Sequence, residues 1–315
     1  MSLECLDLTK IRPQPVAERH VRATEDDFAA PLAPGASVKD LIASLPNLGA
    51  AKDLLRLRDA VLEARAHARP VIAALGSHVL DVGLGPLFAR MIEEGVLSAV
   101  ALTGAALEQD VETALTGQIL GPRDSRAVDG HFCATAETGE LINHAARFAM
   151  TEGLGLGEAV GRALLDHEDV IAAYSITATA ARFHRVLTVH PAIGADAYHL
   201  HPKADGAALG AAGMRDFAKL GGVLAEADRG VVLVFASGAV MPRVLLEALD
   251  AARNLGAAVE GLVTALVDPW APSSAVRTLT ERLPAPNGWG VWIPAPSELV
   301  APLLFASVME GMNGR

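Results

Sequence analysis

The chain alternates short apolar runs with amphipathic helical segments, and this alternation constrains its fold more than any other feature. The apolar runs occupy residues 70–75, 96–104, 185–194, 229–240, 257–267 and 288–294. Apolar residues at helical spacing occur before, between and after these runs, at residues 50–68, 85–95, 106–117, 214–228, 241–256 and 297–312. Strands that are apolar throughout are typical of a parallel sheet buried on both faces. The pattern predicts an α/β fold with a mostly parallel sheet and helices on both of its faces.

The pattern also predicts how the chain is divided. Residues 1–45 carry Pro13, Pro15, Pro31 and Pro34 with little periodicity, which indicates an irregular N-terminal arm. Residues 46–315 are expected to form a single domain, because strands and helices alternate to the end of the chain. Within it, residues 129–184 are expected to be rich in helix.

Charge, the interruption of apolar stretches and cysteine content limit the partners and the compartment that we expect for the chain. The 315 residues include 37 acidic and 26 basic side chains, for a formal net charge of −11, so binding to a nucleic-acid backbone is not expected. Charged residues or Pro interrupt every apolar stretch, and the N-terminus lacks the pattern of a signal peptide, so we expect no membrane insertion. Two cysteines, Cys5 and Cys133, indicate a reducing compartment such as the cytoplasm.

Three turns rich in small residues follow predicted strands, at residues 76–85, 103–110 and 236–240. In an open parallel sheet, ligands bind at the carboxyl ends of strands, where such turns expose backbone N–H groups. Together these turns could hold a dinucleotide. None of them has the G-x-G-x-x-G spacing, so close packing of helices on the sheet is the alternative interpretation.

The densest polar cluster spans residues 190–206 and directly follows a predicted strand. Its histidines His199 and His201, with Asp196, are candidates for substrate binding or proton transfer. With Asp196 or Asp205 they could instead hold Zn²⁺, although the sequence offers no second cluster of ligands, and metal residues are not predicted. Imine chemistry has few candidates, because the chain has only five lysines: Lys10, Lys39, Lys52, Lys203 and Lys219.

The ordered turns and helices of residues 76–115, 185–199, 230–257 and 297–312 resemble those of deoxyhypusine synthases. Residues 152–162, 199–217 and 252–256 are closer still to a divergent bacterial branch of that family. The resemblance implies a Rossmann-like, NAD-binding fold, a homotetramer or dimer, and NAD-dependent oxidation of an amine. The positions that match the family's cofactor turns are Ser77, His78, Gly83, Thr103, Gly104, Ala105, Ala106, Ser237 and Gly238.

One departure from the family concerns its catalytic lysine, whose place is taken by Met241. A thioether forms no imine, and the guanidinium of the nearby Arg243 is not nucleophilic. Lys203 is the only lysine close to the expected substrate loop. We therefore expect an enzyme that is not a true deoxyhypusine synthase, in which NAD acts on a small amine or amino acid.

The candidate catalytic residues are Asp196, His199, His201 and Lys203. Asp196 would bind an ammonium group, and a histidine would take its proton. Two alternatives remain open from the sequence. One is an enzyme similar to NAD-dependent cyclodeaminases, which recycle the cofactor and release ammonia. The other is a nucleotide-binding homologue without catalysis, which the loss of the family lysine favours.

Overall fold

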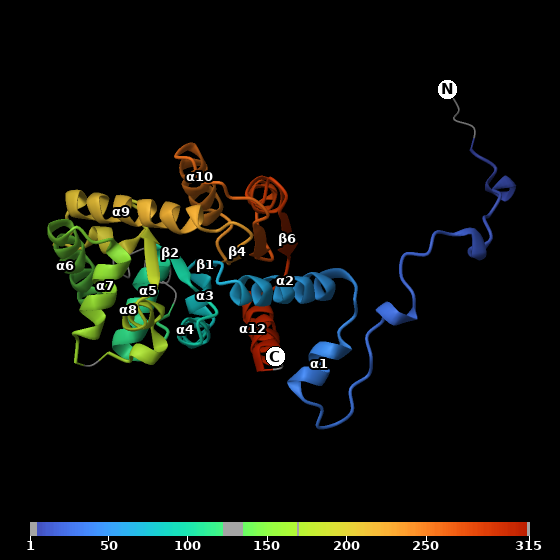
Figure 1. Ribbon diagram of the computed structural model, residues 1–315, viewed down its shortest axis with the longest axis horizontal. Helices are drawn as coiled ribbons and strands as arrows, with labels where there is room; N and C mark the ends of the chain where they lie inside the picture. Colours follow the sequence, from blue (N-terminus) through green and yellow to red (C-terminus); the bar gives the residue numbers. More distant parts are fainter. Residues whose placement is uncertain (1–4, 122–134, 169, 314–315) are drawn as a thin grey trace. The chain divides into compact units, whose positions relative to one another are not determined.

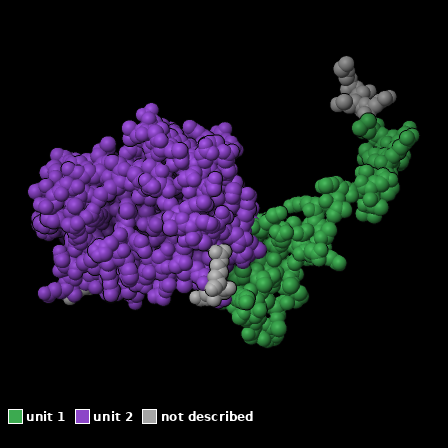
Figure 2. Space-filling view, in the orientation of Figure 1, with its two compact units in different colours: residues 1–52 green, residues 53–315 purple. Residues whose placement is uncertain are grey.

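The computed structural model describes residues 5–121, 135–168 and 170–313. They form two compact units, residues 1–52 and 53–315, which Figure 2 colours separately. The first unit contains three short 3-10 turns and the helix α1 (Val38–Ser44), and Ile42 is the one buried side chain among its described residues. The second unit holds the whole sheet. Cys133 and the start of the expected helix-rich segment lie outside the described residues.

The centre of the second unit is a sheet of six parallel strands in the order β3-β2-β1-β4-β5-β6. Each strand coincides with one of the six apolar runs, so this part of the prediction is confirmed. The order is that of the Rossmann fold, whose direction of winding reverses between β1 and β4. The strands are β1 (Val71–Leu75), β2 (Ala99–Thr103), β3 (Val186–His190), β4 (Val231–Phe235), β5 (Val263–Val267) and β6 (Trp289–Ile293).

Helices cover both faces of the sheet, as the sequence predicted. Successive strand residues point to opposite faces, and each face has its own hydrophobic core. Ala73 and Leu75 pack in the first core, and Ile72 and Ala74 pack in the second core. Figure 1 shows α9 and α10 together, and both pack against the second core. The helices are α2 (Gly49–Ala66), α3 (His78–Asp81), α4 (Gly85–Glu93), α5 (Gly104–Thr116), α6 (Ala136–Glu152), α7 (Leu156–Leu165), α8 (Ile176–Arg182), α9 (Gly206–Ala225), α10 (Met241–Asn254), α11 (Ser273–Arg277) and α12 (Ser297–Asn313).

The start of α9 differs from the prediction. The helix begins at Gly206, eight residues before the apolar pattern that starts at Met214. The Asp205 side chain caps its first turn by accepting hydrogen bonds from the N–H groups of Ala207 and Ala208, at 2.9 and 3.1 Å. Alanine and glycine dominate this first part of the helix, so hydrophobic periodicity gives no signal there.

The stretch after β5 also differs from the prediction, since no helix was expected there. It forms α11 followed by a π-helical turn, η7 (Thr278–Arg282). The buried side chains of Ala275 and Leu279 anchor this stretch in the second core. No helix in the described part of the chain is both long and apolar enough to cross a bilayer.

Candidate functional site

The turns after β1 and β4 touch at the carboxyl edge of the sheet. A Cβ atom on Gly76 would overlap the carbonyl oxygen of Ala236, so only glycine allows the two turns to approach this closely. Ala236 itself has a φ of 48°, a left-handed conformation that costs an alanine of the order of 1 kcal/mol. The fold therefore holds a strained turn at the point where the winding of the sheet reverses, which is where Rossmann folds bind their ligands.

Backbone donors are left without partners at this junction. The N–H groups of Ser77 and His78, after β1, and of Ser237 and Gly238, after β4, donate to no acceptor among the described residues. Successive unpaired N–H groups at turns and helix starts are a common binding site for phosphate oxygens. These four positions were predicted from the sequence as cofactor residues, and the strand order brings their two turns together.

A cavity of about 560 Å³ opens beside the β1 and β2 turns. Two predicted cofactor residues, Ser77 and Ala105, line it. Polar side chains that the sequence analysis did not single out also line it: Asp81, Gln109 and Glu112. The Gln109 amide donates a hydrogen bond to Asp81, and Glu112 accepts one from the Thr135 hydroxyl at 3.1 Å. The cavity therefore presents carboxylates, which suit sugar hydroxyls or an ammonium group.

The acidic residues of α5 explain why these side chains were missed. The sequence predicted a helix with one polar face, but Glu108, Asp110 and Glu112 are all buried. Asp110 stabilises the start of α8 by accepting hydrogen bonds from the Ser175 hydroxyl and from the N–H groups of Ile176 and Thr177, at 2.7 to 2.9 Å. Burial raises the pKa of Asp110. Charge alone does not distinguish such a structural carboxylate from one that lines a cavity.

Asp196 lies against the start of α5. A Cβ atom on Gly104 would overlap the Asp196 carboxylate and would come within 2.8 Å of the Tyr198 hydroxyl. The carboxylate accepts hydrogen bonds from the Ala192 N–H at 2.8 Å and from the Tyr198 hydroxyl at 3.3 Å, and it is 3% exposed. Burial, followed by the nearby Asp196, raises the pKa of Tyr198. The structure thus brings two predicted residues, Asp196 and Gly104, into contact.

His199 is the most unusual side chain of the polar loop. Both of its ring nitrogens are buried and have no hydrogen-bond partner among the residues that the structure describes. Its ring packs on that of Tyr198, with 4.3 Å between the centroids. Burial lowers the pKa of His199, against an opposing effect of the Asp196 carboxylate, so the neutral ring is favoured. A neutral imidazole with an unpaired nitrogen can accept a proton.

His201 and Lys203 have other partners. The His201 ring packs against Gly139 of α6, and its Nδ1 accepts a hydrogen bond from the Lys203 N–H at 3.2 Å. The Lys203 ammonium forms an ion pair with the exposed Glu140, also on α6. Both residues therefore connect the loop to α6. Among the described residues, no group of three or more His, Cys, Asp or Glu side chains could hold a metal ion.

The position of the family lysine is buried in this fold. Met241 begins α10 and is fully buried in the second core. On the preceding turn, a Cβ atom at Gly238 would come within 2.9 Å of Pro272 and 3.1 Å of the Asp268 carboxylate. The remaining predicted cofactor positions lie at or near the same edge: Gly83 after α3, Thr103 as the N-cap of α5, and Ala106 within its first turn.

Comparisons with known proteins identify the fold. No protein-family model matches the sequence, and the curated proteins contain no match to it. Solved structures do match. A protein assigned as a deoxyhypusine synthase from Entamoeba histolytica aligns with a TM-score of 0.55 and 12% identity, over 88% of this chain and 94% of that one. The chain therefore has the deoxyhypusine synthase-like fold. The expectation drawn from the turns and helices is confirmed at the level of the fold.

Two further structures share this fold. AgrE, in a ternary complex with ornithine and NAD⁺, aligns with a TM-score of 0.56 and 15% identity over 86% of this chain. A conserved protein of the LOR/SDH type from Methanococcus maripaludis S2 aligns with a TM-score of 0.50 and 18% identity, over 89% of this chain and 72% of that one. The alignment covers 35% of the AgrE chain, so the present chain corresponds to about a third of that larger protein.

Proposed function

We propose that the chain is an NAD-dependent enzyme that acts on a small amine or amino acid without forming an imine with a lysine of its own. The observation that carries this proposal is the contact between the β1 and β4 turns, where Gly76 meets Ala236 and four backbone N–H groups donate to no acceptor in the described part of the chain. Such a donor set suits the pyrophosphate of a dinucleotide. The acidic cavity beside Ser77 suits the hydroxyls of a ribose or the ammonium group of a substrate.

The polar loop supplies the groups for the substrate. Asp196 lies against Gly104, which places its carboxyl group next to the β2 turn. His199 is the candidate base: burial lowers its pKa and favours the neutral ring, the form that a general base requires, and its ring nitrogens have no partner among the described residues. A bound nicotinamide would supply the acceptor for the hydride that leaves the carbon bearing the nitrogen. His201 and Lys203 are proposed to hold the loop in position through their contacts with α6.

A second candidate is a cyclising deaminase that recycles its cofactor. It is favoured by the likeness to AgrE, whose structure contains ornithine together with NAD⁺. The two candidates differ in their products. A net oxidation accumulates NADH, whereas cyclising deamination releases ammonia and leaves the amount of NAD⁺ unchanged. Incubation with NAD⁺ and a panel of diamines and basic amino acids, followed by both assays, separates them.

Cofactor binding is tested with a thermal-shift titration of NAD⁺, because a ligand that binds only the folded state raises the melting temperature. The variant Ser77→Asp adds a carboxylate beside the unpaired N–H groups, and we expect it to weaken NAD⁺ binding at least about tenfold by repulsion of the pyrophosphate. Ser274→Asp, at an exposed serine on α11, is the matched control and is expected to bind as the parent does. Binding that is equal in both variants, or no shift with millimolar NAD⁺, would overturn the cofactor assignment.

A further inference from the structure

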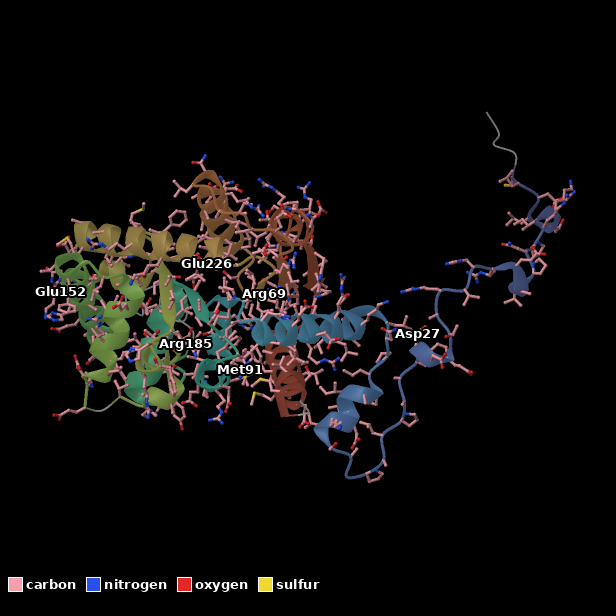
Figure 3. The ribbon with its side chains drawn as sticks, in the orientation of Figure 1. Asp27, Arg69, Met91, Glu152, Arg185 and Glu226 are labelled. Carbon is pink, nitrogen blue, oxygen red and sulfur yellow. The ribbon has the colours of Figure 1, made fainter. Side chains whose placement is uncertain are left out.

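A second cavity lies at the opposite, amino edge of the sheet. It has a volume of about 550 Å³, and its residues precede or begin strands: Arg69 before β1, Arg229 before β4, Val263 at the start of β5 and Trp289 at the start of β6. Figure 3 labels Arg69, which lies in the segment between α2 and β1. Because all six strands are parallel, this amino-edge pocket is separated from the proposed cofactor site by the length of the sheet.

Arg56 provides the pocket with a cation that has no carboxylate partner. Its guanidinium carbon lies 3.7 Å from the centroid of the Trp289 ring, and no ion pair involves Arg56 among the described residues. A guanidinium stacked on an aromatic ring keeps its planar N–H edge available for a carboxylate. Nearby, Arg69 approaches Glu63 only to 3.8 Å, which is longer than a hydrogen-bonded ion pair.

Glu260 provides a carboxylate that accepts a hydrogen bond from the Asn287 side chain. Its Oε2 accepts a hydrogen bond from the Asn287 side chain at 3.0 Å, its N–H donates to Asp228 at 3.0 Å, and its carbonyl accepts from the Arg229 N–H at 2.8 Å. Arg229 and Asn287 have φ values of 51° and 61°, so both occupy the left-handed region that non-glycine residues rarely adopt. The Glu260 backbone is therefore held by Asp228 and Arg229, and the Asn287 amide orients its carboxylate.

The cations and carboxylates of the pocket balance. Its lining includes three arginines and three acidic side chains, together with the Asn287 amide and the Trp289 ring: Arg56, Arg69, Arg229, Asp59, Glu63 and Glu260. A lining of one sign would favour a simple anion or a simple cation. A balanced lining, with a stacked guanidinium and a fixed carboxylate, favours a ligand that bears both charges.

We infer that the amino-edge pocket binds a small zwitterion of the α-amino acid class, separately from the proposed active site. Its carboxylate meets the N–H edge of Arg56, and its ammonium group meets Glu260. This inference does not depend on the proposed function, because binding here requires neither NAD nor turnover.

The test compares three probes by calorimetry in the absence of NAD⁺: L-norvaline, pentanoate, which lacks its amine, and butylamine, which lacks its carboxylate. We expect saturable millimolar binding of norvaline and at least tenfold weaker binding of the other two. The indole N–H signal of Trp289, assigned by its loss in Trp289→Phe, is expected to shift with norvaline. No saturable binding of norvaline at 20 mM, or equal binding of all three probes, overturns the inference.

Variants locate the site. Arg56 and Glu260 are exposed, so Arg56→Gln and Glu260→Gln are expected to fold, and each is expected to weaken norvaline binding at least tenfold. Arg277→Gln, at an exposed arginine on α11 outside the pocket, is the matched control and is expected to bind norvaline as the parent does. Ser77→Asp is expected to retain norvaline binding, which separates this result from a failure of the cofactor proposal. Unchanged binding in Arg56→Gln would overturn the inference.

Discussion

Gly104 is the residue at which the fold and the candidate site depend most directly on each other. Replacement by alanine would press a methyl group into the Asp196 carboxylate and within 2.8 Å of the Tyr198 hydroxyl. We expect Gly104→Ala to lower the free energy of unfolding by about 1–3 kcal/mol, as overpacking does elsewhere, although alanine favours helix. Denaturant unfolding measures the change.

Gly210 is the matched control for this substitution. It also lies in a helix, α9, but a Cβ atom there would meet nothing within 4 Å. Gly210→Ala is expected to leave stability unchanged or to raise it by up to about 1 kcal/mol. If both variants had the same stability, the close contact between Asp196 and the start of α5 would not exist in solution.

The residues of the candidate site were predictable from the sequence to different degrees. Ser77 and Ser237 were predictable because each lies in the turn that follows an apolar strand, and strand ends are where parallel sheets bind ligands. Asp81 and Glu112 were not, because their position depends on how α3 and α5 pack beside a cavity. Local pattern carries no information on such a contact between distant segments. The lack of hydrogen-bond partners at the His199 ring nitrogens was not predictable either, because it results from burial by tertiary packing.

At the scale of elements, Asp216 connects its own helix, α9, to α7 and β3. One of its oxygens accepts hydrogen bonds from the Gly157 N–H at the start of α7 and the Val189 N–H in β3, both at 2.9 Å. Its other oxygen is buried and has no hydrogen-bond partner among the described residues. Burial raises the pKa of Asp216 to about 7. The folded state therefore holds this proton more tightly than the unfolded chain does.

The raised pKa of Asp216 determines how the stability of the protein depends on pH. A raised folded pKa contributes stability that is fully present below the unfolded value of 3.8 and is lost as the pH rises to about 7. Asp216→Asn keeps an acceptor for both N–H groups and cannot ionise. We expect the stability of the variant relative to the parent to increase by up to about 4 kcal/mol between pH 4 and 7, and to level off above that.

Denaturant unfolding of parent and variant across pH 4–8 checks this prediction. The difference between the two proteins is the relevant quantity, because exposed carboxylates with lowered pKa values, such as Asp40 and Glu140, act with the opposite sign in both. Asp216→Ala is expected to be destabilised at every pH, since it leaves two buried N–H groups unpaired. A difference that did not change with pH would mean that Asp216 is charged in the folded protein.

Elements were predicted well wherever burial imposes a pattern. The six strands are apolar throughout because helices cover both faces, so β1 and β4 were visible as uninterrupted apolar runs. The first turns of α9 were not predicted because Ala and Gly form no recognisable apolar stripe. The helix α11 was not predicted because it is short and follows two prolines. Strand order could be expected only through family resemblance, since each apolar run is compatible with many neighbours.

At the scale of the whole molecule, the parallel sheet gives its two edges different chemistry. The carboxyl edge presents unpaired N–H groups, a feature of strands that lead into helices. The amino edge presents side chains from the loops that return from helices, and these include a stacked guanidinium and a fixed carboxylate. The two proposed binding sites therefore lie at opposite edges of the sheet, on different sets of loops.

The N-terminal residues of the first unit are expected to contribute little to the stability of the whole chain. None of its described residues before Ser37 is buried, and large apolar side chains such as Leu8, Val16 and Phe28 are more than half exposed. Deletion of residues 1–36 is therefore expected to change the free energy of unfolding by less than about 1 kcal/mol. Thermal and denaturant unfolding of the shortened chain measure it.

Deletion of residues 1–66 is the control, because it also removes α2, whose Leu57 and Val61 are fully buried in the first core. That protein is expected to lose several kcal/mol and to unfold at ordinary temperature. Light scattering on the full and shortened chains then tests the expected homo-oligomer. If deletion of residues 1–36 removed several kcal/mol and also dissociated an oligomer, the exposed apolar side chains of the arm would be covered by another copy of the chain.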